Sequence, residues 1–216
     1  MVTIVSRADW GARPPRSRYA ITTPTPELYI HHTAGALDAG GNGVWWDDVR
    51  GIQDFHMDGR GWSDIAYSFI VGGGQVFEGR GAGIAGGHTK GRNTVSHAIC
   101  LIGSYDFMTP QPKDLRAIAD LVRHGREQGW WGEITGGHRN APGASTSCPG
   151  NHLQAAIPEI RALAAAGTTT EDDVDEAQVK AIVDAEGAEI RQWTREELKR
   201  QLAPIREKLG LTPLPQ

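Results

Sequence analysis

Residues 64–80, DIAYSFIVGGGQVFEGR, contain two short apolar runs on either side of three consecutive glycines. Runs of this length, rich in β-branched and aromatic residues and separated by glycine, predict two strands joined by a hairpin turn. A phosphate-binding loop is the other structure that glycine-rich segments form, but it needs a helix directly after the glycines. A second apolar run stands there instead, so this part of the chain is predicted to lie in a β-sheet.

Strand and helix patterns alternate on both sides of this hairpin. The predicted strands are residues 28–33 (LYIHHT), 97–105 (HAICLIGSY) and, as a short piece, 133–138 (EITGGH). The predicted helices are residues 44–57, 112–129 and 151–167, the last despite Pro158. Alternating strands and helices indicate an α/β fold, which we expect to have a central mixed β-sheet flanked by helices.

The segment at residues 164–173, AAAGTTTEDD, looks like a domain boundary, because small residues, a glycine and three threonines precede an acidic run. We therefore expect a catalytic domain at residues 1–166, a linker at 167–173 and a helical tail at 174–216. The tail carries an apolar helical stripe, which must be buried somewhere. It is predicted to pack on the first domain or to mediate self-association with another copy through its helices.

Charge and hydropathy exclude several partners. The formal net charge is −4 at pH 7, and no basic stripe is present, so we expect no nucleic-acid partner. No apolar run is long enough to span a bilayer, so no membrane partner is expected either. The first residues lack the basic-then-apolar pattern of a secretory signal, which favours a protein made without a signal peptide.

The loop at residues 136–150, GGHRNAPGASTSCPG, holds one of the two cysteines in the chain. Cys148 follows His138 at the end of a predicted strand, and a thiolate with an imidazole suggests a catalytic zinc site. A third ligand would come from His31 or His32, and only one of these can point at the metal, because neighbouring strand residues face opposite sides. The plain alternative is that the cysteine is a small buried residue and the histidines are structural.

Five segments of the chain, in order, resemble the peptidoglycan recognition protein/type 2 amidase family, which includes phage lysozymes of the amidase type. They are RADWGARPP, YIHHTAG, IQDFHMDGRGWSDIAYSFIVGGGQVFEGRG, GGHTKGRNTVSHAICLIGSY and GHRNAPGASTSCPG. The resemblance runs from residue 6 to about residue 165 and leaves the tail uncovered. Five motifs in the same order make it highly specific.

The resemblance implies zinc-dependent N-acetylmuramoyl-L-alanine amidase activity on peptidoglycan. The zinc ligands of the family match His31, His138 and Cys148, with Zn²⁺ as the cofactor. Members that only bind peptidoglycan usually lack this cysteine, so an enzyme is expected rather than a binding module. A different zinc hydrolase that acts on ordinary peptides remains a second alternative.

The resemblance also implies roles for residues around the metal. Tyr67 matches the active-site tyrosine, and Thr146 matches a position held by lysine or threonine; both are expected to stabilise the oxyanion. His88 matches a groove-lining histidine, and Arg92 lies where the family contacts the stem peptide, so it could pair with a carboxylate. The remaining histidines, including His56, are interpreted as structural or solvated.

One departure from the family concerns the cysteine loop. The family's commoner pattern, H-R-D-x-x-P-T-x-C-P-G, is two residues shorter than HRNAPGASTSCPG, and Asn140 replaces the usual acid. Loops tolerate such insertions at low entropic cost, so both ligands are kept.

A phage endolysin is the cellular role that this family suggests. Together with the missing signal pattern, it implies a protein that waits in the host cytoplasm and acts on the cell wall after release. The sequence leaves the host and the type of stem peptide open.

Overall fold

A computed structural model describes residues 2–35 and 45–166 of the chain. The predictions for the linker and the helical tail at residues 167–216 lie outside these residues. The described strands form one six-stranded sheet, in the order β1 (Ile4–Val5), β4 (Gln75–Glu78), β3 (Phe69–Gly72), β5 (Ser96–Leu101), β2 (Glu27–His32) and β6 (Gly136–Gly137). Only β3 and β4 pair antiparallel among them. The predicted hairpin and the mixed sheet are both confirmed.

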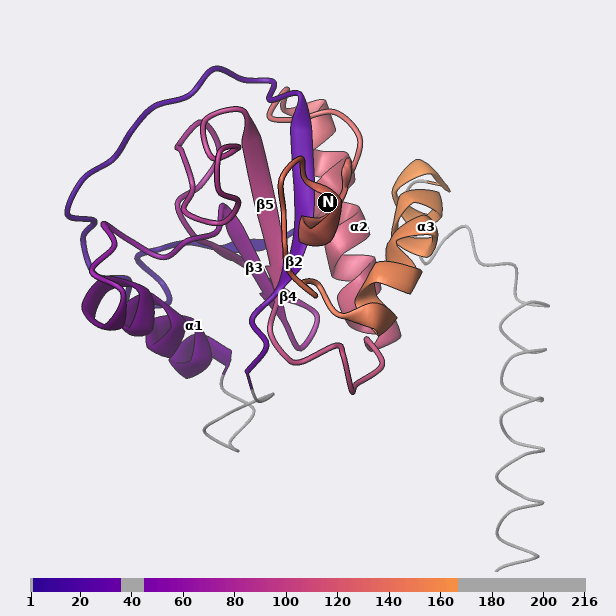
Figure 1. The fold of residues 1–216 in the computed structure, drawn as a ribbon, viewed down its shortest axis with the longest axis horizontal. Helices are drawn as coiled ribbons and strands as arrows, with labels where there is room; N and C mark the ends of the chain where they lie inside the picture. The colour runs from indigo at the N-terminus through magenta and orange to yellow at the C-terminus, as the bar shows by residue number, and fades with distance from the viewer. Residues whose placement is uncertain (1, 36–44, 167–216) are drawn as a thin grey trace, which may run out of the picture. The chain divides into compact units, whose positions relative to one another are not determined.

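Helices cover both faces of the sheet (Figure 1). Helix α1 (Trp45–Asp54), which continues into a π-helical turn (Phe55–Gly59), lies on one face. Helices α2 (Pro112–Glu127) and α3 (Asn151–Ala166, with Pro158 inside it) lie on the other. In the described residues no helix is both long and apolar enough to cross a membrane.

Strand alternation divides the core into two clusters. Leu28 and Ile30 of β2 point into the larger cluster, with the apolar faces of α2 and α3. Ile70 of β3 points the other way and packs with Trp10 and with Val49 of α1. Because side chains alternate along a strand, His31 emerges on the α1 face of the sheet.

The strand predicted at residues 133–138 is much shorter than expected. Of these six residues, only Gly136 and Gly137 (β6) pair with β2, and the chain then turns into a 3₁₀ helix (His138–Asn140). Crowding explains why glycine stands at the turn: a Cβ on Gly137 would lie 2.2 Å from Gln154 Oε1 and 2.4 Å from Pro149 Cδ. Because β6 ends at Gly137, His138 lies at the start of the 3₁₀ turn, at the edge of the sheet.

Candidate metal centre

The strand register brings two of the predicted ligands together. In the parallel pairing of β2 with β6, Tyr29 lies beside Gly136 and Ile30 beside Gly137. The next residue after each of these paired segments is a histidine, His31 after β2 residue Ile30 and His138 after β6, and the centroids of the two rings are 4.6 Å apart. Two segments more than 100 residues apart in the sequence thus place imidazoles side by side at the carboxyl end of the sheet.

Cys148 comes to the same place from the loop that follows the 3₁₀ turn. Its Sγ lies 3.6 Å from Nδ1 of His31 and accepts a hydrogen bond from the backbone N–H of His32 at 3.5 Å. The backbone N–H of Arg139 donates to the Cys148 carbonyl at 2.9 Å, which fixes the end of the loop. One donor atom from each of His31, His138 and Cys148 lies within 4.8 Å of the others.

These three groups fit zinc. Bond lengths of about 2.3 Å to sulfur and about 2.0–2.1 Å to nitrogen, at tetrahedral angles, place the two donor atoms about 3.6 Å apart. The observed separation of Cys148 Sγ and His31 Nδ1 is 3.6 Å. Two imidazoles and a thiol leave a fourth position open, as catalytic zinc sites require.

Burial sets the protonation states of the three groups. It lowers the pKa of His31 far below its ordinary value, with smaller contributions from His88 and His138. It also lowers the pKa of His138, so both imidazoles are neutral and can offer lone pairs at pH 7. Burial raises the pKa of the Cys148 thiol to about 11, opposed by the His32 backbone N–H. A coordinated metal ion deprotonates such a thiol.

The structure separates the two neighbouring histidines of β2. His32 points to the opposite side of the strand, where its Nδ1 accepts a hydrogen bond from the backbone N–H of Tyr105 at 3.2 Å. Its imidazole is therefore part of the packing beneath the loop after β5. Of the pair, only His31 joins the cluster.

Asn140 takes over a structural task in the extended loop. Its side-chain oxygen accepts a hydrogen bond from the backbone N–H of Gly137 at 2.9 Å, which closes the 3₁₀ turn that carries His138. An amide oxygen accepts such a bond as a carboxylate does. The replacement of the usual acid therefore leaves the turn intact.

Tyr67 and Thr146 both lie beside the cluster. The Tyr67 ring centroid is 5.5 Å from that of His31, and burial, with Cys100 nearby, raises the pKa of its phenol well above 10. The phenol is therefore a proton donor at neutral pH. Thr146 is exposed at the rim, and its Oγ1 accepts a hydrogen bond from the Cys148 backbone N–H at 3.1 Å. Their catalytic roles stay predictions.

A cavity of about 260 Å³ lies directly over the cluster. It shares His88, His138 and Thr146 with a groove of about 800 Å³, and His56 and Tyr67 with a cleft of about 440 Å³ beside α1. The candidate metal centre thus sits between two open clefts. A long substrate can therefore pass over it in both directions.

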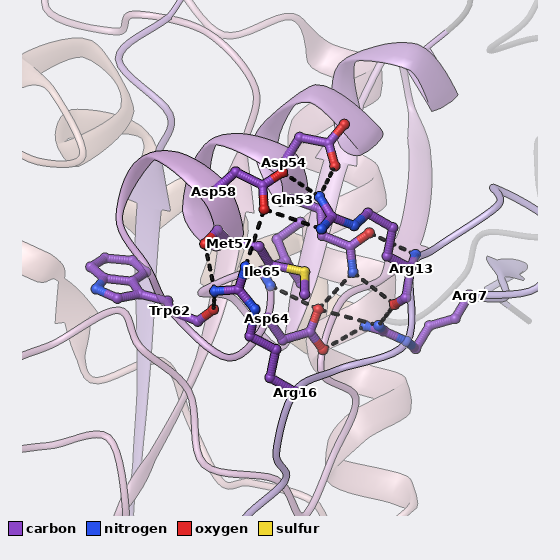
Figure 2. Close-up of polar contacts among 10 residues, drawn as sticks. All are labelled: Arg7, Arg13, Arg16, Gln53, Asp54, Met57, Asp58, Trp62, Asp64 and Ile65. Carbon is purple, nitrogen blue, oxygen red and sulfur yellow. Dashed lines mark hydrogen bonds and ion pairs between the residues drawn. The ribbon is translucent and has the colours of Figure 1, made fainter.

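One wall of this cavity was not anticipated from the sequence. His56 has the structural role expected of it, because its Nδ1 accepts the backbone N–H of Ala66 at 3.2 Å. It also lines the cavity, where its ring stacks on Trp62 with centroids 5.0 Å apart. Arg16 holds this wall, since its guanidinium donates to the carbonyls of Met57 at 2.7 Å and Trp62 at 3.2 Å (Figure 2).

The two predicted substrate-binding residues have different surroundings. His88 is buried and lines both the cavity and the larger groove. Arg92 forms a bidentate ion pair with Glu27 at the start of β2, with Nε 2.8 Å from Oε2, and is not among the residues that line the larger groove. Lys90 is the exposed cation that lines it. A recognition role for Arg92 stays a prediction.

Comparison with known proteins places these features in a family. Residues 22–151 match a protein family described as N-acetylmuramoyl-L-alanine amidase. Peptidoglycan-recognition protein SC2 of Drosophila simulans is 36% identical over 155 residues, which cover 70% of this chain and 83% of that protein. The N-acetylmuramoyl-L-alanine amidase of Sus scrofa is 39% identical over 155 residues, covering 68% of this chain and 25% of that protein.

A solved structure shows the same fold. Peptidoglycan recognition protein-LE, in complex with tracheal cytotoxin (monomeric diaminopimelic acid-type peptidoglycan), superposes with a TM-score of 0.65 at 31% identity. The match covers 72% of this chain and 92% of that chain. The expected fold class is confirmed.

Proposed function

Because the chain belongs to the N-acetylmuramoyl-L-alanine amidase family, we propose that it hydrolyses the amide between N-acetylmuramic acid and L-alanine in peptidoglycan, with zinc as its cofactor. The observation that carries this proposal is the meeting of His31, His138 and Cys148 beneath an open cavity. The amidase of Sus scrofa, which is similar over 155 residues, supports the reaction. The similarity to a protein solved with a peptidoglycan fragment supports the substrate class.

Each group of the centre has a distinct task in this reaction. His31, His138 and Cys148 would hold zinc, which supplies Lewis-acid polarisation of the scissile carbonyl and an acidified water when bound. The Tyr67 phenol, kept protonated by burial, donates a hydrogen bond to the oxygen on which negative charge develops. Thr146 offers a second hydroxyl from the rim of the cavity.

The two clefts give the substrate room on both sides of the scissile amide. One cleft takes the glycan side and the other takes the stem peptide. The groove of about 800 Å³ contains Lys90 on its surface, which makes it the side suited to the carboxylates of a stem peptide. The Arg80 guanidinium in the wall of this groove is used for structural hydrogen bonds, since it donates to the backbone carbonyls of Ile65 at 2.6 Å and Ala85 at 2.9 Å.

A peptidoglycan-binding module without activity is the second candidate, because peptidoglycan-recognition proteins are among the relatives. The three clustered ligand groups of His31, His138 and Cys148 favour the enzyme over the binding module. A binding module has no need of a thiol at 3.6 Å from a neutral imidazole, nor of a buried phenol beside them. Release of soluble stem peptide separates the two functions.

The proposal extends from the reaction to the cellular role, which is lysis of a bacterial host. We infer a phage endolysin that accumulates in the host cytoplasm and reaches the wall once the membrane is opened. Its support is the resemblance of the motifs to phage lysozymes of the amidase type. The test is expression in bacteria with and without a membrane-permeabilising agent: lysis only after permeabilisation supports the role, and absence of lysis in both cases contradicts it.

The decisive experiment for the reaction is product analysis on purified cell walls. Wild-type protein loaded with one zinc per chain is incubated with peptidoglycan, and the soluble products are identified by mass spectrometry. Free stem peptides that begin with L-alanine, lost after chelation and regained with zinc, are expected. Ordinary peptides serve as the control substrate. Cleavage of these instead would identify a different zinc hydrolase, and wall binding without product would identify a binding module.

A further inference from the structure

Thr89 joins two histidines beneath the cavity. It is buried, with 2% of its surface exposed, and its Oγ1 lies 3.3 Å from Nε2 of His31 and 3.0 Å from Nδ1 of His88. The side chain of Asn93 fixes this segment, because its oxygen accepts the backbone N–H groups of both His88 and Thr89 at 2.9 Å. The hydroxyl therefore forms a bridge between a candidate metal ligand and a histidine of the groove.

A hydroxyl has only one proton to donate, so the bridge must have a direction. Both rings are neutral at pH 7, since burial lowers the pKa of His31 far below its usual value and that of His88 to about 3. A neutral imidazole donates from one nitrogen and accepts at the other. The direction of the bridge therefore decides which nitrogen of His31 carries its proton.

The other nitrogen of His31 indicates the direction. Its Nδ1 lies 3.6 Å from Cys148 Sγ, which is the separation of two zinc ligands, and a ring nitrogen that binds a metal ion carries no proton. The proton of the neutral His31 ring is then on Nε2, which donates to the Thr89 oxygen 3.3 Å away. The Thr89 hydroxyl in turn donates to Nδ1 of His88 at 3.0 Å. This leaves the proton of His88 on Nε2, a buried atom with no hydrogen-bond partner among the described residues.

We propose that Thr89 is a positioning residue that fixes His31 with its proton on Nε2, so that the Nδ1 lone pair faces Cys148 and the zinc. The part that concerns zinc rests on the proposed function. In the reverse direction His31 would carry its proton on Nδ1, the atom 3.6 Å from Cys148 Sγ. That proton would occupy the metal position, and zinc would bind only after the tautomer changed.

The first test needs no variant. Long-range ¹H–¹⁵N spectra of the metal-free wild-type protein report which nitrogen of each histidine is protonated. We expect Nε2–H for both His31 and His88. A proton on Nδ1 of His31 in the folded, metal-free protein would overturn the proposal, whatever the activity of the enzyme.

The second test removes the hydroxyl while keeping the shape of the side chain. Thr89→Val leaves Nε2–H of His31 and Nδ1 of His88 without a partner in a buried site, and Thr89→Ser keeps the hydroxyl. Loss of the hydrogen bond behind a metal-binding histidine weakens binding by about 10–100-fold. We expect that loss of zinc affinity, measured by chelator competition, in Thr89→Val, with most of the affinity recovered in Thr89→Ser.

Thr94 is the matched control, because it is an exposed threonine in the same segment. Thr94→Val should keep the wild-type zinc affinity and the wild-type histidine spectra. Should Thr89→Val fail to fold, the wild-type spectra and the Thr89→Ser protein still decide the question. Equal zinc affinity in folded Thr89→Val and wild type would overturn the positioning role.

The outcomes also separate this inference from the proposed function. A wild-type protein that binds zinc and cleaves muropeptides, with a Thr89→Val variant unchanged in zinc affinity and spectra, contradicts the role of Thr89 alone. A wild-type protein that binds no zinc contradicts the proposed function. In that case a shift of the His31 tautomer in Thr89→Val would still support Thr89 as the residue that orients this ring.

Discussion

Two polar clusters of this protein differ in which partners they already have. At the candidate metal centre, two neutral imidazoles and a thiol bring their ligand atoms within 4.8 Å of one another. Between the N-terminal segment and α1, by contrast, carboxylates are matched by arginines, as Figure 2 shows. Asp64 accepts from Arg7 at 3.0 Å, from Gln53 at 2.7 Å and from its neighbouring backbone N–H at 2.8 Å.

The comparison shows why an accumulation of acidic residues is a poor indicator of a metal site. Asp54 and Asp58 both pair with Arg13, at 2.7 Å and 2.5 Å, so this region already contains its counter-charge. The histidines and the cysteine hold lone pairs directed at one another, which only a metal ion or a proton can satisfy. The first arrangement fastens the N-terminal segment, and the second is suited to bind a cation.

The largest effect is expected from the metal centre. Cys148→Ser removes the soft ligand that favours zinc, so zinc content and amidase activity should both be lost. Cys100→Ala is the matched control, because Cys100 is the other free cysteine and is not one of the clustered donors. Zinc is measured by atomic emission on both purified proteins. A fully metallated and active Cys148→Ser protein would show that the cluster is not the metal site.

The second effect concerns the arginine network. Asp64→Ala leaves Arg7 and the Gln53 amide without their buried acceptor, and breaking a buried ion pair costs about 3–5 kcal/mol. We expect urea unfolding to show this loss while zinc affinity at low temperature is unchanged. Asp58→Ala should lose far less, because Asp58 is more than half exposed and exposed pairs contribute little. Equal losses in the two variants would contradict the distinction between buried and exposed parts of the network.

A smaller effect separates zinc binding from catalysis. Tyr67→Phe should keep zinc and fold but lose about 100-fold in kcat, the usual effect of removing one oxyanion donor. Thr146→Val should show a milder loss, since Thr146 is exposed and its hydroxyl already accepts the Cys148 N–H. Rates on soluble muropeptides measure both. A Tyr67→Phe protein as fast as wild type would leave the tyrosine with a packing role only.

The smallest effect, counted per pH unit, tests whether burial alone keeps an imidazole neutral. His97 lies away from the metal centre; its Nδ1 donates to Thr25 Oγ1 at 2.8 Å and its Nε2 accepts from the Gly83 N–H at 3.0 Å, while burial lowers its pKa to about 4. The unfolded chain, with a pKa of about 6.5, takes up the proton first. The stability from His97 is therefore complete above about pH 6.5 and falls by about 1.4 kcal/mol per pH unit towards pH 4.

This pH dependence is measured by urea unfolding of metal-free protein at several pH values. His97→Gln has no imidazole to protonate, so its free energy of unfolding should fall less steeply with acid than that of wild type. His56 and His138, whose pKa values are also lowered by burial without a contribution from His97, titrate in both proteins and cancel in the comparison. His97 contributes to the lowered pKa of His88, so the change at His88 belongs to the same effect. Parallel curves would show that His97 is not neutral through burial.

Local sequence patterns were enough to predict the α/β class and most of the helices and strands. The glycines between two apolar runs predicted the β3–β4 hairpin, and the spacing of apolar residues predicted α2 and α3, because these signals depend on neighbours along the chain. The strand at residues 133–138 was predicted too long. At its end Gln154 and Pro149 leave no room for a side chain on Gly137, and local sequence does not contain this tertiary contact.

For the site, the sequence alone determined which groups are available: a loop cysteine, a histidine ten residues before it, and a histidine pair in a strand. It also determined that only one of the pair could face the metal, since alternation along a strand is a local rule. The choice of His31 from spacing alone stayed open, and only the family resemblance favoured it.

The tertiary structure decided everything that depends on distant segments lying side by side. The parallel register of β2 with β6 places His31 next to His138, and the packing of the loop brings Cys148 to them. The same packing turned Arg92 towards Glu27, made His56 and Trp62 a cavity wall, and set Thr89 between His31 and His88. Pairing register and burial arise from the whole chain, and they alone fix the pKa values and hydrogen-bond directions that turn available groups into a site.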